Sequence, residues 1–169
     1  MQTTDYITHQ PIDLPAVMAS LCNPNTGGMV LFSGEVRDSN KGKSVAFLEY
    51  EAYESMARKK IKEIVDFAIT NWHLNDALCI HRLGRLDITD CAVVVITASK
   101  HRAEAYEANR YIIDRVKFEV PIWKNEHFTD GTNEWGNNSD CQCADPKHHS
   151  PMSFLHPINP PAKLTTSEN

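Results

Sequence analysis

The most unusual chemistry in this sequence is a run of cations where a helix is expected to begin. Apolar residues at helical spacing predict a helix over about 100–119, and Ser99 is a favourable N-cap residue. The first turn would then contain Lys100, His101 and Arg102, although a helix N-terminus carries positive partial charge and favours acidic side chains. Free N–H groups beside clustered cations form a site for an anion, such as phosphate or carboxylate. The alternative is that these side chains are simply solvated.

A second group of cations follows the strand expected over 28–36. Arg37 ends that strand, and the polar loop after it contains Lys41, Gly42 and Lys43. Glycine gives such a loop conformational freedom. The commoner interpretation is a solvated hairpin loop. The functional one is a mobile basic flap over an anionic ligand.

Two lysines stand on either side of Pro121, which ends the second helix because the residue before proline is disfavoured in the α region. Lys117 lies in the last turn, where a cation is electrostatically favourable, so it has a structural explanation as well. Lys124 follows Trp123 in a short apolar stretch. A lysine in an apolar pocket near other cations loses its proton more easily, and it can then act as general acid/base or as nucleophile.

The remaining histidines and cysteines give weaker signals. His81 lies in an expected strand and is predicted to be a structural group. Cys79 and Cys91 are predicted to be small buried hydrophobes without catalytic roles. The only cluster that resembles metal ligands has no standard structural zinc spacing, so we predict no physiological metal site; it consists of Cys141, Cys143, His148 and His149.

Composition restricts the classes of function. Among the 169 residues, 17 are Lys or Arg and 22 are Asp or Glu, which gives a formal charge of −5 and disfavours non-specific nucleic-acid binding. No apolar run approaches the ~20 residues of a membrane helix, and the N-terminus lacks the features of a secretory signal. The five cysteines are an odd number, which favours reduced thiols and a cytoplasmic protein. Motifs for classical nucleotide binding and triad hydrolysis are missing.

Strand and helix patterns alternate through residues 1–135, which predicts a mixed α/β domain of the α+β class. We expect residues 136–169, rich in proline and turn formers, to be a mostly disordered tail. The expected strands cover 6–8, 28–36, 45–50, 77–86, 92–97 and 122–124, and the expected helices cover 13–21, 54–72 and about 100–119.

Five segments in this order resemble the large, catalytic subunit of molybdopterin synthase, over about residues 27–135. The resemblance is more specific than any one segment, because their order and gaps agree as well. The segments are Gly28–Arg37, Leu48–Tyr53, Ile80–Gly84, Ala98–Arg102 and Pro121–Glu126.

The resemblance implies an α/β hammerhead fold with an added antiparallel β subdomain. It also implies a homodimer core within a heterotetramer, in which a small ubiquitin-like subunit inserts its Gly-Gly C-terminus into each large subunit. That terminus carries a thiocarboxylate. The implied reaction is the transfer of two sulfurs to cyclic pyranopterin monophosphate (precursor Z), which makes the dithiolene of molybdopterin. Because the partner brings the sulfur, neither a reactive cysteine nor a cofactor is expected.

The resemblance assigns roles to individual residues. Lys117 becomes the leading acid/base candidate, and Lys124 a second one that also orients the acyl terminus. Glu126 would hold Lys124 through a charge pair. The full set implied to bind substrate is Glu35, Val36, Arg37, His101, Arg102, Lys117, Lys124, Asn125 and Glu126.

Two other interpretations remain open. A non-enzymatic module could bind a phosphate ligand with Arg37, His101 and Arg102 alone, without needing the two lysines. A structural dimer could instead carry its function in the tail, for example by binding metal through the Cys/His cluster. An RNA-binding role is weaker, because the charge is negative and aromatic and basic residues do not interleave.

Overall fold

The computed structural model describes residues 5–137, which fold into three helices and two β-sheets. The mixed α+β class predicted from the sequence is confirmed. None of the helices in this range is long and apolar enough to span a membrane. In chain order the elements are β1 Ile7–Thr8, α1 Leu14–Ser20, β2 Gly28–Glu35, β3 Ser39–Asn40, β4 Lys43–Ala52, α2 Glu54–Asn71, β5 Asp76–Arg82, β6 Gly84–Asp87, β7 Cys91–Ser99, α3 Arg102–Glu119, β8 Ile122–Phe128 and β9 Asn133–Asn137.

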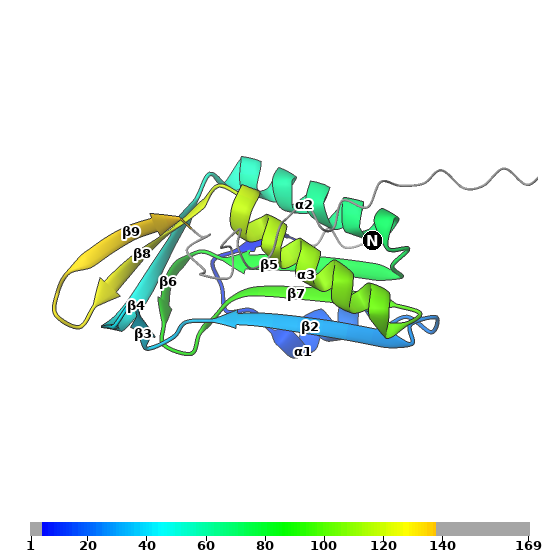
Figure 1. Cartoon of the computed structure of the whole chain (residues 1–169), viewed down its shortest axis with the longest axis horizontal. Helices are drawn as coiled ribbons and strands as arrows, with labels where there is room; N and C mark the ends of the chain where they lie inside the picture. The colour runs from blue at the N-terminus through cyan, green and yellow to red at the C-terminus, as the bar shows by residue number, and fades with distance from the viewer. Residues whose placement is uncertain (1–4, 138–169) are drawn as a thin grey trace, which may run out of the picture. The chain divides into compact units, whose positions relative to one another are not determined.

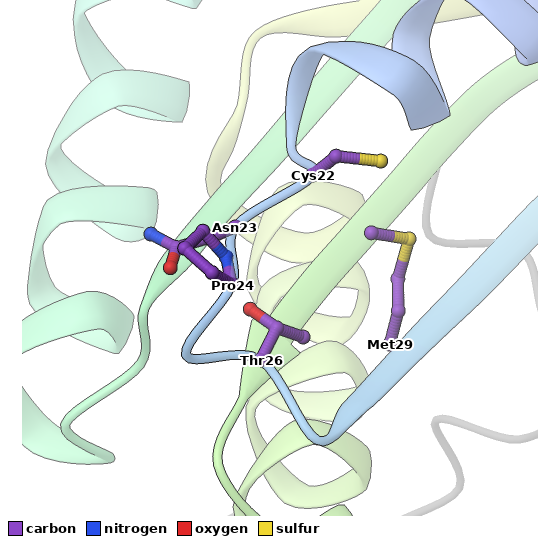
Figure 2. A pocket seen from close by; sticks show the side chains of 5 residues that line it. All are labelled: Cys22, Asn23, Pro24, Thr26 and Met29. Carbon is purple, nitrogen blue, oxygen red and sulfur yellow. The ribbon is translucent and has the colours of Figure 1, made fainter.

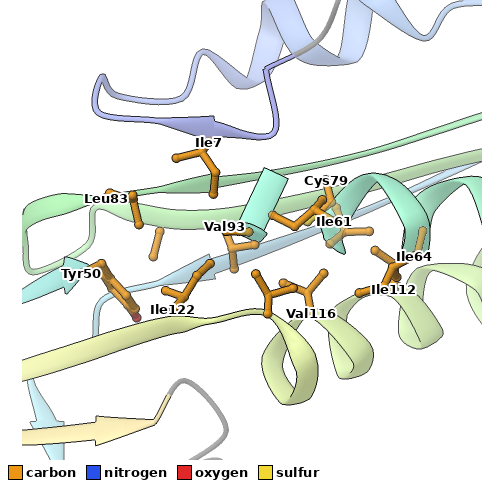
Figure 3. Packing of buried hydrophobic residues seen from close by; sticks show 14 of the residues in the cluster. Ile7, Tyr50, Ile61, Ile64, Cys79, Leu83, Val93, Ile112, Val116 and Ile122 are labelled. Atoms are coloured by element: carbon orange, nitrogen blue, oxygen red, sulfur yellow. The ribbon is translucent and has the colours of Figure 1, made fainter. Parts of the chain in front are cut away.

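The first sheet has strand order β1-β5-β7-β2, with α2 and α3 on one face and the short α1 on the other (Figure 1). The central strand β7 is buried on both faces. Val93 and Val95 join the core under α2 and α3, and Val94 and Ile96 pack on the side of α1. Figure 3 shows the larger cluster, in which Ile61, Ile112 and Val116 bring the two long helices onto the sheet. Helix α1 begins as predicted, with Asp13 capping the N–H of Ala16 at 3.1 Å.

The second sheet is antiparallel, with order β3-β4-β8-β9 and β6 paired to β4. It corresponds to the added subdomain that the resemblance implies. Its register matters for the site, because Tyr50 of β4 faces Lys124 of β8, and Leu48 faces Glu126. Side chains directly opposite one another lie on the same face of a sheet. Tyr50, Lys124 and Glu126 therefore project toward the same side.

Helix α3 is held on the first sheet by polar contacts as well as by apolar packing. The buried Asn109 amide donates to the carbonyl oxygens of Val30 at 3.0 Å and Val95 at 3.1 Å. The buried Thr97 hydroxyl donates to the carbonyl of Ala105 at 2.7 Å. Since hydrogen bonds are directional, these contacts define how α3 is rotated about its own axis.

The structure corrects three details of the sequence-based elements. The strand expected over 77–86 is two strands in different sheets, because Gly84 takes a φ of +83° and the chain turns there. The strand expected over 122–124 extends to Phe128, because β8 lies between β4 and β9. Gly136 and Asn137, which composition placed in the tail, pair with β8 as the end of β9. The rest of the expected tail lies outside the described residues.

Candidate active site

Strand β8 carries a buried ion pair between Lys124 and Glu126, two residues apart on one face. Lys124 Nζ lies 3.1 Å from Glu126 Oε1, and their side chains are only 13% and 10% exposed. The second carboxylate oxygen of Glu126 accepts a hydrogen bond of 2.7 Å from the amide of Asn40 in β3. Buried charges are tolerated only when they are paired and hydrogen-bonded in this way. The pair therefore fixes one ammonium group at a defined position.

Lys117 approaches the same region from the last turn of α3. Burial, and to a smaller extent the positive charge of Lys124, lower its pKa from 10.5 to about 8. A lysine with such a pKa exchanges its proton near neutral pH, as a general acid or base requires. This lowered pKa is the property expected of Lys117 as the leading acid/base candidate.

The other polar groups near the two lysines remain uncharged. Burial raises the pKa of Tyr50 to about 12 and that of the Cys79 thiol to about 12. Burial is also the main cause that lowers the pKa of His81 to about 3, and the charge of Lys117 acts in the same direction. His81 packs edge-on against Tyr50, with ring centroids 5.0 Å apart, and its Nδ1 lies 2.9 Å from the Arg82 carbonyl. These residues form an uncharged surface next to Lys117, and a protonated Cys79 is a poor nucleophile.

The other end of α3 differs from the sequence prediction. Ser99 is the last residue of β7 and its hydroxyl donates to the carbonyl of His101, so His101 occupies the N-cap position instead. Lys100 and His101 therefore precede the helix, and Arg102 is its first residue. All three are exposed. Gly27 sits against this turn so closely that a methyl group there would overlap the carbonyl oxygen of Lys100.

The two ends of α3 do not meet within one chain. At 1.5 Å per residue, Arg102 and Lys117 are about 22 Å apart along the helix. Five of the expected site residues of a single chain therefore fall into two groups at opposite ends of this helix. One is the buried cluster of Lys117, Lys124 and Glu126, and the other is the exposed pair of His101 and Arg102.

The segment after β2 leads into β3, whose Asn40 contacts the buried cluster. Arg37 is exposed, and it precedes Asn40 by three residues, which limits their Cα atoms to a separation of about 11 Å. Asn40 in turn contacts Glu126 of the buried cluster. Val36 is buried and is held by backbone bonds to Thr89 and Asp90. Glu35 is exposed and accepts a hydrogen bond from Ser33.

Asn125 lies between Lys124 and Glu126 in the sequence, but side chains alternate between the two faces of a strand. It faces Glu49 of β4 and Trp135 of β9, so its side chain lies on the face opposite to Lys124 and Glu126. It is 5% exposed, and its Oδ1 has no hydrogen-bond partner among the described residues. The structure thus does not place Asn125 with the lysines.

Other features of the described chain do not add to this site. A shallow pocket lies between the end of α1 and the start of β2 and is lined by Cys22, Asn23, Pro24, Thr26 and Met29, none of them an expected site residue (Figure 2). Within residues 5–137 no group of three His, Cys, Asp or Glu side chains could hold a metal ion. Cys79 is buried as predicted, whereas Cys91 is only half-buried. The Cys/His cluster of the expected tail lies outside the described residues.

Sequence reasoning did not identify Asn40 or Tyr50. Asn40 meets Glu126 across 86 residues of chain, and Tyr50 reaches His81 from another sheet. Only the polar hairpin around Asn40 could have been a signal, because asparagine and glycine are typical of turns.

Comparison with known proteins gives consistent matches. Residues 7–119 match the family model described as MoaE protein. The chain is 46% identical over 125 residues to a molybdopterin synthase catalytic subunit from Halalkalibacterium halodurans, with 74% of this chain and 80% of the relative covered. The crystal structure of molybdopterin synthase from Staphylococcus aureus superposes with a TM-score of 0.75 at 38% identity, covering 80% of this chain and 99% of that one.

A more distant structure shares the fold. It is the protein–protein complex of subunits 1 and 2 of molybdopterin-converting factor from Helicobacter pylori, which matches with a TM-score of 0.65 at 22% identity over 77% of this chain and 88% of that one. The family match covers the first sheet and the helix that carries Lys117. The chain therefore belongs to the MoaE family, whose curated members are catalytic subunits of molybdopterin synthase.

Proposed function

We propose that the cluster of Lys117, Lys124 and Glu126 is the sulfur-transfer centre of a molybdopterin synthase. The substrates would be cyclic pyranopterin monophosphate and the thiocarboxylated C-terminus of a small ubiquitin-like subunit. The observation that carries the proposal is a titratable lysine beside a lysine whose charge is fixed by a carboxylate. A purely phosphate-binding module would need no lysine whose pKa is lowered to about 8.

The two lysines have different tasks in this reaction. The positive charge of Lys124 attracts the anionic thiocarboxylate and stabilises negative charge on the acyl oxygen. Lys117 exchanges protons with the pterin or with water near neutral pH. The thiocarboxylate sulfur bonds to a carbon of the pterin side chain as an oxygen substituent leaves that carbon with a proton from Lys117. Water then attacks the acyl carbon, and the bond between that carbon and the sulfur breaks. The terminus leaves as a carboxylate, and the sulfur stays on the pterin as a thiolate. Glu126 keeps Lys124 in position throughout.

The phosphate of the pterin would be bound by Arg37 together with His101 and Arg102 from a second copy of the chain. The homodimer provides a geometric reason, because one chain holds its own His101 and Arg102 about 22 Å from Lys117. Strand β2 is the outer strand of the first sheet, and its Gly28 end packs against Arg102. Antiparallel pairing of two β2 strands would bring the Gly28 end of one copy beside the Glu35 end and Arg37 of the other.

The small subunit and the location of the reaction belong to the same proposal. The Helicobacter pylori fold relative was solved as a complex of two subunits, which supports a heteromeric enzyme here. Neither the lysines nor the partner's sulfur requires a resident metal or organic cofactor. We place the reaction in the cytoplasm, where thiols and a thiocarboxylate persist in reduced form.

The test is product formation from purified components. The full chain is mixed with a thiocarboxylated ubiquitin-like partner and cyclic pyranopterin monophosphate, and molybdopterin is measured through its fluorescent oxidation product. We expect activity in the native chain and its loss in Lys117→Ala. If the chain forms a stable complex with the partner and the pterin but yields no product, the catalytic role is wrong and the protein is a binding module. Removal of residues 138–169 tests the alternative that the function lies in the C-terminal segment. We expect the shortened chain to retain sulfur transfer.

A further inference from the structure

The hairpin formed by β3 and β4 is attached to the buried ion pair by one side chain. Asn40 Nδ2 donates to Glu126 Oε2 at 2.7 Å, and Glu126 Oε1 accepts from Lys124 at 3.1 Å. The two contacts use different oxygens, so together they define both the position and the rotation of the carboxylate. The neighbours of Asn40 make no such hydrogen bond to this carboxylate among the described residues, and Ser39 donates to Asp38 at 3.0 Å.

We propose that Asn40 is a positioning residue of the sulfur-transfer centre, which acts by holding the Glu126 carboxylate against Lys124. The inference rests on the proposed function, but the contact between Asn40 and Glu126 is present in the protein without substrate. Asn40 has no charge and stands outside the set of residues expected to touch substrate.

The hairpin itself is shaped to present this amide. Lys41 takes a φ of +49° and Gly42 a φ of +79°, which closes the turn directly after Asn40. Lys43 forms an ion pair with Glu134 of β9, so the hairpin is also attached to the strand at the opposite edge of the sheet. Since this attachment is independent of Asn40, loss of the amide should leave the hairpin in place. It should release only the carboxylate.

Release of the carboxylate has a defined electrostatic consequence at Lys117. The charge of Lys124 lowers the pKa of Lys117, and the Glu126 carboxylate beside Lys124 offsets part of that charge. A carboxylate that turns away offsets less of it. The pKa of Lys117 in Asn40→Ala should therefore fall below its native value, which moves the protonation of Lys117 toward lower pH.

Two measurements on the full chain test the proposal. The first follows the reaction of Lys117 with a trace amine-reactive anhydride in the resting protein at a series of pH values, by mass spectrometry of its peptide. We expect Asn40→Ala to move the midpoint of this reaction to lower pH, and Ser39→Ala, the matched control, to leave it unchanged. The second is sulfur transfer, for which we expect kcat to fall about tenfold in Asn40→Ala with partial recovery in Asn40→Gln.

A double-mutant cycle separates positioning from a general structural role. If Asn40 acts through Glu126, adding Asn40→Ala to Glu126→Gln should change neither the midpoint nor kcat further. Additive effects, or a native midpoint in an Asn40→Ala protein of native melting temperature, would overturn the proposal. The anhydride reaction needs no substrate. It would therefore still decide the role of Asn40 if the native chain transferred no sulfur.

Discussion

The two ends of α3 carry cations in opposite environments. At its C-terminal end Lys117 is desolvated beside Lys124, and its pKa is lowered to about 8. At its N-terminal end Arg102 is exposed to solvent, with His101 at the N-cap. One helix thus presents a titratable cation at one end and a solvated one at the other.

The difference teaches which chemistry each end can perform. Burial makes the charge of a lysine conditional on pH, which suits proton transfer. An exposed arginine remains charged at every physiological pH, which suits the binding of phosphate. The division also agrees with a site assembled from two copies of the chain, one supplying each end.

Loss of the buried cation should have the largest effect on activity. We expect Lys117→Ala to lower kcat about a thousandfold, because it removes the proton-exchanging group without removing the charge of Lys124. Single-turnover formation of molybdopterin is the measurement, and Arg110→Ala, an exposed position on the same helix, is the control. Activity within tenfold of native would contradict the catalytic role of the buried end.

Loss of the counter-charge should have the largest effect on stability. Glu126→Ala leaves Lys124 buried without its carboxylate, which should lower the free energy of unfolding by about 3 kcal/mol. Asp114→Ala breaks the exposed pair with Arg110 on α3 and should cost less than about 0.5 kcal/mol. Urea unfolding compares the two variants, and equal losses would show that burial does not distinguish the pairs.

The pH dependence of stability should report the desolvation of Lys117 directly. Its folded pKa of about 8 lies below the ordinary 10.5, so the unfolded chain binds more protons between these values. The free energy of unfolding of the native protein, relative to Lys117→Met, should therefore rise by up to about 3 kcal/mol from pH 8 to 10.5. Tyr50 and Cys79 titrate in both proteins, so the difference isolates Lys117. A difference that is constant with pH would argue against a desolvated ammonium.

A substitution at the exposed N-terminal end of α3 should have the smallest effect, and it should change activity without changing stability. We expect Arg102→Ala to lower the rate about tenfold and to leave the melting temperature unchanged, because the side chain is solvated. Lys59→Ala on α2, whose side chain is 77% exposed, is the matched control. Mixing Lys117→Ala with Arg102→Ala chains should restore about a quarter of native activity if each site uses both copies. No recovery in confirmed mixed dimers would place the whole site in one chain.

Local patterns predicted the elements better than the contacts between them. The helix over 54–72 and the Asp13 cap depend on neighbouring residues, and the structure has both. The helix start at Ser99 was wrong because pairing with Gly28 keeps Ser99 in β7. The assignment of Lys117 and Lys124 to one site came from the family resemblance. No local pattern indicates that Asn40 meets Glu126 or that Asn125 faces away, since both depend on strand register.

The hydrogen bonds of Asn109 determine where the chain tolerates inserted residues. They fix the rotation of α3 against Val30 and Val95 near the middle of the helix. Insertion of one residue on either side of Asn109 would turn one end relative to the other by about 100° and move Arg102 or Lys117 away from its surroundings. An insertion in the turn between β8 and β9, which holds none of the expected site residues, turns no helix. Related chains should therefore vary in length at that turn and keep the spacing between Arg102 and Lys117 constant.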